Sequence, residues 1–208
     1  MTDHMLSKIN FIGEWTFRLA YVNLLWICFS VLGLFLFGFF PATAAMFTVI
    51  RKWRLKEQVP IFQTFKETYR KEFTDANKVG WLLMFIGFFL YIDFFILFRL
   101  EGSIFLFLAF ILIPLTFVYL SILLYIFPVF VHFQLKNIEY IKYAFIISLS
   151  YPHLTILMLL GSFVLISIYL TFPMFFPLLL GSSLSTLCMY ISKRVVQKLE
   201  KGELAVPA

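Results

Sequence analysis

Long apolar runs limit what this chain can fold into more than any other feature of its sequence. A helix crosses the roughly 30 Å hydrocarbon core of a bilayer with about 20 apolar residues, and five segments reach that length. Because the runs are continuous rather than alternating, they predict helices and not the short strands of a membrane barrel. The expected spans are about residues 17–40, 79–98, 104–131, 152–170 and 173–192.

The overall composition also argues against a soluble protein. Of the 208 residues, 62% are hydrophobic and only 13% are charged, whereas soluble domains carry roughly 25% charged residues. One water-soluble core in a chain of this length could not bury that much apolar surface. We therefore predict an all-α, polytopic transmembrane bundle that forms a single membrane domain over residues 1–208.

Basic side chains gather in three of the polar segments, namely residues 51–78, residues 132–150 and the C-terminal tail from Lys193. These segments hold 14 of the 17 Lys and Arg residues. Five spans would place all three segments on one side of the membrane, and the excess of positive charge predicts that this side is cytoplasmic. We expect a multi-pass protein of the cytoplasmic membrane, with the basic loop 51–78 and the C-terminus inside.

The first apolar run leaves two topologies open. Residues 17–50 would form a helix of about 51 Å, which is too long for one crossing. Pro41 suits the first turn of a new helix and disrupts a helix interior. We favour one span that ends near residue 40, followed by a second helix that leaves the membrane at Arg51, with the N-terminus outside. A tight hairpin within 17–50 would instead give six crossings and an inside N-terminus.

The basic loop contains the pattern of an amphipathic helix near residues 60–75. Aromatic residues recur there at three- and four-residue spacing, with charged residues between them; they are Phe62, Phe65, Tyr69 and Phe73. This pattern predicts a helix that lies along an anionic membrane surface. A docking surface for a cytoplasmic partner is the alternative interpretation. A nucleic-acid partner is not expected, because the loop is short and interleaved with membrane-seeking aromatics.

Few polar residues lie inside the expected spans. Asp93 is the candidate intramembrane polar residue: it is either an interfacial acid that reaches water or pairs with Arg99, or an ion or proton site. Pro114 and Pro128 in the third span are typical of kinks, which in some transporters line a substrate site. The small-residue spacing Gly181-x-x-x-Ser185 predicts close helix contact, and Asn23 can hydrogen-bond across helices.

No motif for a cofactor, a metal or a catalytic nucleophile is present in the sequence. The phosphate-binding, zinc-protease and nucleophile-elbow patterns are absent. Cys28 and Cys188 lie far apart inside apolar runs and suit buried apolar positions. The sequence therefore predicts no catalytic residue, no cofactor, no metal site and no enzymatic activity.

One segment carries a family resemblance. The run Phe40-Pro41-Ala42-Thr43-Ala44-Ala45, followed by Arg51-Lys52-Trp53, resembles the YesL family of small bacterial membrane proteins of unknown function. The resemblance extends back to Asn23. Pro41 is expected to start a helix, and the alanines are expected to allow close contact with neighbouring helices. The Arg-Lys-Trp end is expected to anchor that helix at the lipid headgroups. The candidate motif, of unknown role, comprises Asn23, Pro41, Ala42, Thr43, Ala44, Ala45, Arg51, Lys52 and Trp53.

The resemblance implies no catalytic residues, but it implies gene neighbours: sugar-uptake transporters, two-component sensors and polysaccharide-degrading enzymes. We therefore expect an accessory or assembly partner of a carbohydrate ABC transporter or sensor. Its partners would be the lipid bilayer and a membrane protein such as a transporter permease or sensor kinase, or further copies of itself. The alternative is a small transporter or channel for a sugar or ion that works as an oligomer.

Overall fold

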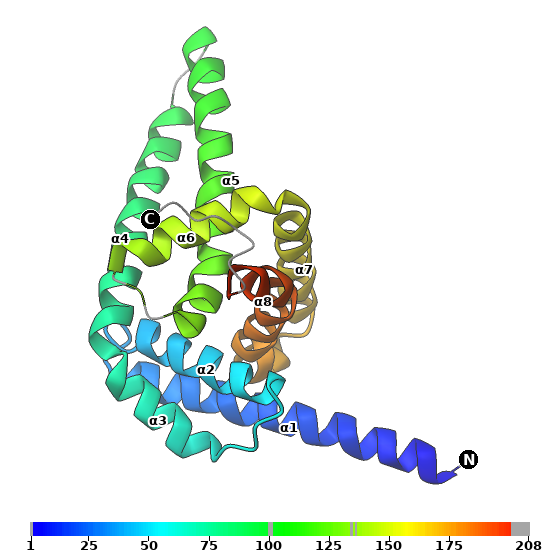
Figure 1. Cartoon of the computed structure of the whole chain (residues 1–208). Coiled ribbons are helices and arrows are strands. Elements are labelled where there is room, and N and C mark those ends of the chain that lie inside the picture. The colour runs from blue at the N-terminus through cyan, green and yellow to red at the C-terminus, as the bar shows by residue number, and fades with distance from the viewer. Residues whose placement is uncertain (1, 100–101, 134, 136, 201–208) are drawn as a thin grey trace. The chain divides into compact units, whose positions relative to one another are not determined.

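The structure, a computed structural model, describes residues 2–99, 102–133, 135 and 137–200 (Figure 1). Lys136 and Lys201, two of the basic residues that the predicted orientation uses, lie outside the described residues. No strand is present in the described ranges, which confirms the all-α prediction. The elements are α1 (Thr2–Leu32), α2 (Phe39–Arg54), α3 (Ile61–Lys71), α4 (Phe73–Leu97), α5 (Ser103–His132), α6 (Asn137–Ser150), α7 (Pro152–Thr171), a 3-10 turn (Pro173–Phe175) and α8 (Phe176–Glu200).

Four of these helices are long and apolar enough to cross a membrane: α1 from Gly13, α4, α5 and α7. The expected spans 79–98, 104–131 and 152–170 fall within α4, α5 and α7 to within a few residues. The span expected at 173–192 corresponds to the 3-10 turn and the first part of α8, and α8 is not among the four described helices that meet the length and apolarity of a span. The amphipathic helix expected near 60–75 is present as α3.

The first span ends earlier than the expected residue 40, because α1 stops at Leu32. Two left-handed residues reverse the chain there, Leu34 with φ 56° and Phe35 with φ 61°. Gly33 and Gly38 then approach each other so closely that a Cβ on Gly33 would overlap the Gly38 backbone, and a Cβ on Gly38 would lie 2.9 Å from the Gly33 Cα. The next helix begins at once, and α1 and α2 pack together as a helical hairpin.

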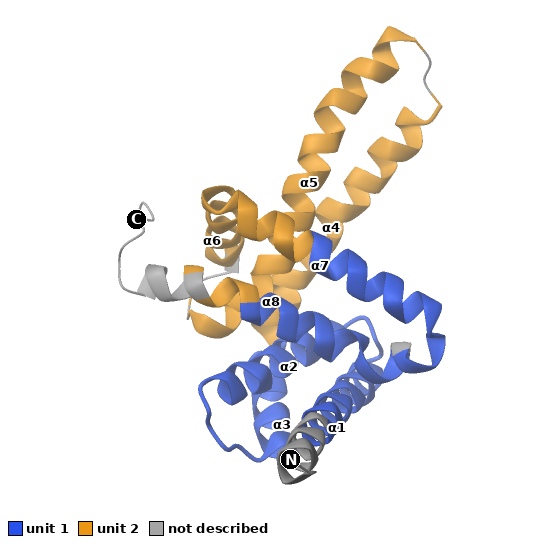
Figure 2. Ribbon diagram, turned by 90° about the vertical axis from the view of Figure 1, so that its right-hand side faces the viewer, with its two compact units in different colours: residues 1–73, 160–190 blue, residues 74–159, 191–208 orange. Residues whose placement is uncertain are grey.

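The chain forms two compact units (Figure 2). The first contains residues 1–73 and 160–190, and the second contains residues 74–159 and 191–208. That the whole chain behaves as one membrane domain stays a prediction.

In the first unit, α2 is the enclosed helix. Ten of its 16 residues are buried, and α1 and α3 both pack against it. Pro41 is the third residue of α2, in the first turn, where a missing N–H costs no helical hydrogen bond. A Cβ on Gly181 would lie 3.4 Å from the Met46 methyl group, so α8 also reaches α2.

In the second unit, α5 is one continuous helix that contains both Pro114 and Pro128. The Tyr119 hydroxyl donates a hydrogen bond to the Leu83 carbonyl oxygen of α4 at 3.1 Å, and α6 packs along α5. The wholly buried Thr155 hydroxyl of α7 donates to the Ser148 carbonyl oxygen at 3.0 Å. Side chains therefore satisfy carbonyl groups on neighbouring helices, as the bilayer interior requires.

Candidate functional site

The candidate motif lies entirely in the first unit, on α1 and α2. Asn23 is on α1, Pro41 to Ala45 form the first half of α2, and Arg51 to Trp53 form its last turn. Because the two helices form a hairpin, Trp26, one turn after Asn23, lies beside the start of α2. The Trp26 indole N–H donates to the Thr43 hydroxyl at 3.0 Å. That hydroxyl donates in turn to the Phe39 carbonyl oxygen at 2.7 Å.

Asn23 joins α1 to the first turns of α8. Its Nδ2 donates to the Pro177 carbonyl oxygen at 2.6 Å, and its Oδ1 accepts from the Ser182 backbone N–H at 3.0 Å. Both polar ends of this wholly buried amide are thus satisfied. A Cβ on Gly181 would lie 2.7 Å from Asn23 Oδ1, so the contact requires glycine there. This confirms the close helix contact predicted around Gly181.

The alanines of the motif supply close packing rather than chemistry. Ala42, Ala44 and Ala45 have no exposed surface. Small side chains let neighbouring helices approach, and this approach is what stabilises helix pairs where lipid gives no hydrophobic driving force. This part of the motif builds the interior of the first unit.

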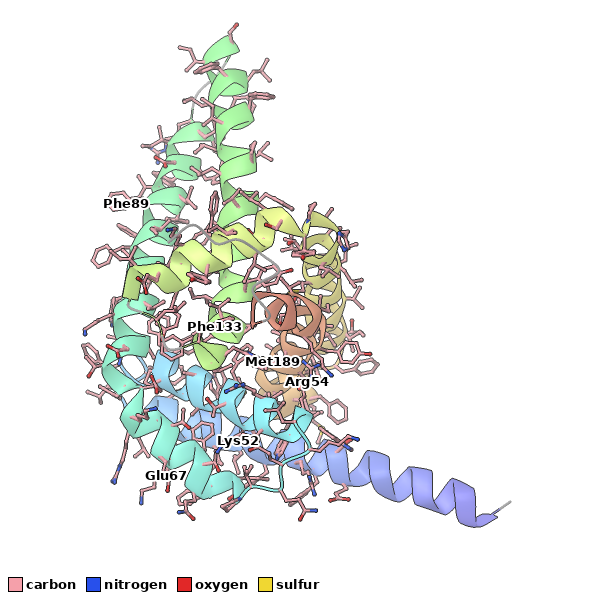
Figure 3. The ribbon with its side chains drawn as sticks, viewed as in Figure 1. Lys52, Arg54, Glu67, Phe89, Phe133 and Met189 are labelled. Atoms are coloured by element: carbon pink, nitrogen blue, oxygen red, sulfur yellow. The ribbon has the colours of Figure 1, made fainter. Side chains whose placement is uncertain are left out.

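The basic end of the motif differs from the headgroup anchor that the sequence predicts. Trp53 is only 7% exposed, and its ring packs edge-on against Trp15 with the centroids 6.0 Å apart. Arg51 and Lys52 are half-buried. Arg54, outside the predicted motif, lies over the Tyr190 ring at 5.6 Å. Burial lowers the pKa of the Arg54 guanidinium from its ordinary value, and Tyr190 partly opposes that shift. Lys52 and Arg54 are labelled at this end of α2 in Figure 3.

Comparison with known proteins places these residues in a family. The family of unknown function DUF624 matches residues 19–94, which include the whole motif. Over 96% of this chain and 90% of its own length, an uncharacterized Bacillus subtilis protein, YteU, is 36% identical. YesL, an uncharacterized protein of the same organism, is 33% identical over 98% of this chain and 96% of its own length. The chain belongs to the YesL-like family.

A third uncharacterized B. subtilis protein, YesV, is 36% identical over 88% of this chain and 88% of its own length. No solved structure matches the chain. The YesL-like resemblance predicted from the Pro-Ala-Thr-Ala-Ala and Arg-Lys-Trp segments is therefore confirmed, and its residues prove to be those that assemble α1, α2 and α8.

Asp93 belongs to the second unit and lies on the exposed surface of α4. Arg99, its predicted partner, stacks on the Phe95 ring at 4.5 Å. Within the described ranges, the two side chains form no ion pair. The same ranges contain no group of His, Cys, Asp and Glu side chains that could hold a metal ion. The exposure of Asp93 therefore agrees with an acid that reaches water rather than one that pairs with Arg99, and the ion or proton site stays a prediction.

The sequence missed one cluster of this YesL-like protein, the aromatic contact between α1 and α3. The Phe29 ring meets Phe65 at 5.2 Å and Tyr69 at 5.0 Å between centroids. The Tyr69 hydroxyl donates to the Phe29 carbonyl oxygen at 3.3 Å. The three- and four-residue aromatic spacing in α3 carried the signal, but it indicated a lipid-facing stripe rather than a packing partner on α1.

Proposed function

We propose that this protein is an accessory subunit that assembles with a carbohydrate-uptake transporter or a sensor in the bacterial cytoplasmic membrane. In this proposal the basic segment 51–78 faces the cytoplasm, as its positive charge favours. The partner is a permease or a sensor kinase with an acidic cytoplasmic surface. Gene neighbourhoods of the YesL-like family point to carbohydrate uptake as the system.

One observation carries the proposal: the residues that mark the family are used for internal packing. Asn23 and Thr43 make their hydrogen bonds within the unit, and the alanines between them are buried. A motif built this way has a structural role rather than a catalytic one. The surface that such a shape presents is what a partner would recognise.

The polar face of α3 is the most suitable contact surface in the first unit. It consists of exposed side chains, Gln63, Lys66, Glu67, Arg70 and Lys71. Gln63 Nε2 donates to the Glu67 carboxylate at 3.0 Å, which holds the acid on the same face. Glu67 lies on the outer side of α3, away from α2 (Figure 3). An acidic partner surface would be complementary to Lys66, Arg70 and Lys71.

Crosslinking in living cells, followed by purification in mild detergent, tests the proposal. The wild-type chain should recover a permease or kinase in stoichiometric amount. A variant with Lys66→Glu, Arg70→Glu and Lys71→Glu should lose most of it, because like charges now meet across the contact. Lys142→Glu, which changes one exposed residue of α6, is the matched control and should retain the partner.

Recovery of the chain alone, or only with copies of itself, would contradict the accessory role. The alternative, an oligomeric transporter or channel for a sugar or ion, would then be tested by solute flux into vesicles. Equal loss of the partner in the α3 variant and in the Lys142 control would remove α3 as the contact.

A further inference from the structure

The three helices α1, α2 and α3 form a layer with charge at both of its ends. In Figure 1, α3 runs back along α2 toward the turn between α1 and α2. Arg51, Lys52 and Arg54 occupy the last turn of α2, at one end of the layer. Arg70 and Lys71 occupy the last turn of α3. The last turn of α3 is at the other end of the layer, because Tyr69 lies beside the turn between α1 and α2. Its hydroxyl would lie 2.7 Å from a Cβ on Gly33.

If the layer stood upright, with α1 crossing the bilayer, it would carry this charge into the hydrocarbon core. The 11 residues of α3 extend about 16 Å along α2, at 1.5 Å per residue. Lys66, Glu67 and Arg70 are exposed along that length. A charged side chain near the bilayer centre is costly, and three of them together would offset much of the stability of a small domain.

The opposite side of the layer is apolar. Phe17, Leu24 and Val31 follow one another at seven-residue spacing on α1, and their exposed fractions are 74%, 50% and 53%. Leu24 is five residues from Phe29, which faces α3, and so lies about 140° around the helix from it. The turn continues the apolar surface, with Leu34 at 80% exposed and Phe35 at 57%. The layer is therefore polar on its α3 side and apolar on the side of this α1 stripe.

We propose that α1, α2 and α3 lie in the plane of the membrane as an interfacial layer, and that α1 does not cross the bilayer. The α1 stripe of Phe17, Leu24 and Val31 rests on the acyl chains of one leaflet. The polar face of α3 points to the water and phosphate groups on the same side. The N-terminus then lies on the same side as residues 51–78. Although α1 meets the length for a span, it is the least apolar of the four candidate helices, as suits an in-plane helix.

Depth measurements with spin labels test this orientation. Single cysteines replace Phe17, Leu24 and Val31 in a background with Cys28→Ser and Cys188→Ala, and the full-length protein is reconstituted in vesicles of phosphatidylethanolamine and phosphatidylglycerol. The ratio of collisions with oxygen to collisions with a nickel complex reports the depth of each label. An in-plane layer gives the same ratio at all three sites, which span about 21 Å of helix.

A matched set on α5 shows that the method resolves a crossing helix. Leu106, Ile113 and Leu120 have the same seven-residue spacing and are exposed, and their ratios should differ from one site to the next. A maximum at Leu24 would show that α1 crosses and would overturn the proposal. A steady rise from Phe17 to Val31 would show an upright hairpin that dips into the membrane, and would overturn it equally. Spin-labelled variants that keep the helical circular dichroism of the parent are the ones compared.

Discussion

Asn23 on α1 and Gly181 on α8 approach so closely that no side chain fits between them. A Cβ on Gly181 would lie 2.7 Å from Asn23 Oδ1, and Asn23 is held there by hydrogen bonds to Pro177 and Ser182. The family resemblance includes Asn23 but leaves its role open. The structure assigns it the role of joining two helices that are separated by more than 150 positions in the sequence.

Gly181→Ala should destabilise the protein. Asn23 cannot move aside without losing its two hydrogen bonds, so we expect a loss of about 1–3 kcal/mol in the free energy of unfolding. Thermal unfolding in mild detergent measures it. Gly13→Ala is the control, because nothing lies within 4 Å of a Cβ at that helical position, and it should be neutral or stabilise by up to about 1 kcal/mol. Equal losses in both variants would contradict the close contact.

Asn23→Ala should cost about 1–3 kcal/mol, because it leaves the Ser182 N–H and the Pro177 carbonyl without their side-chain partner. It also opens the space that a Cβ on Gly181 needs. Gly181→Ala should therefore cost less in the Asn23→Ala background than in the wild type. Unfolding of the two single variants and the double variant gives the coupling directly. Strict additivity would show that the two residues act independently.

Trp26 and Thr43 should be energetically coupled in the same way. Thr43→Val removes the hydroxyl that accepts from the Trp26 indole and keeps the volume of the side chain nearly unchanged. We expect a loss of about 0.5–1.5 kcal/mol. In a Trp26→Phe background, Thr43→Val should lose less stability, because the shared hydrogen bond is already gone. A double-mutant cycle followed by tryptophan fluorescence is the measurement, and a coupling energy of zero would rule out the bond.

The pair Gly87 and Tyr119 offers a rescue experiment in the second unit. A Cβ on Gly87 would overlap the Tyr119 hydroxyl and lie 3.0 Å from the ring carbon that carries it. Gly87→Ala should therefore destabilise α4 against α5. Tyr119→Phe alone loses only the hydrogen bond to Leu83, about 1 kcal/mol. Added to Gly87→Ala, it should restore part of the lost melting temperature. A double variant less stable than Gly87→Ala alone would contradict this contact.

Tyr69 should make the contact of α3 with α1 sensitive to alkaline pH. Burial raises the pKa of the Tyr69 hydroxyl above its ordinary value of 10.0. Because the pKa of Tyr69 is higher in the folded than in the unfolded protein, its contribution to stability is fully present below pH 10, the ordinary pKa. That contribution is lost as the pH rises through the raised pKa of the folded state. Between about pH 8 and pH 11, the wild type should thus lose more stability than Tyr69→Phe. Parallel losses in both proteins would show that another group is responsible.

Helix boundaries could be predicted from the sequence where charge or proline marks them, as for α5, α7 and the end of α4. The end of α1 could not. Leu34 and Phe35 are not residue types that favour left-handed backbone, and the turn depends on the approach of Gly33 to Gly38, which is a property of the pair. Pro114 and Pro128 do not end α5, because a proline inside a helix is compatible with a continuous helix when its neighbours hold it.

The residues of the candidate site could be identified from the sequence, but their contacts could not. Three- and four-residue spacings indicate which face of a helix is packed, and not which distant segment covers it. For that reason Asn23 was predicted to bond across helices, while Pro177 as its acceptor was not. Tryptophan is a residue type that often anchors a helix at the headgroups, but Trp15 packs against Trp53. That contact depends on the reversal of the chain after Leu32.

The turn between Gly33 and Gly38 has a practical consequence for anyone who fuses a reporter to this protein. Its backbone is closed by hydrogen bonds from Phe35 N–H to the Ser30 carbonyl and from Phe37 N–H to the Gly33 carbonyl. The number of residues in it is therefore fixed. An epitope or fluorescent protein inserted there would separate α1 from α2. The four exposed apolar residues of the turn do not make it a tolerant insertion site. Among all the connections of the first unit, this is the one where an insertion should be tolerated least.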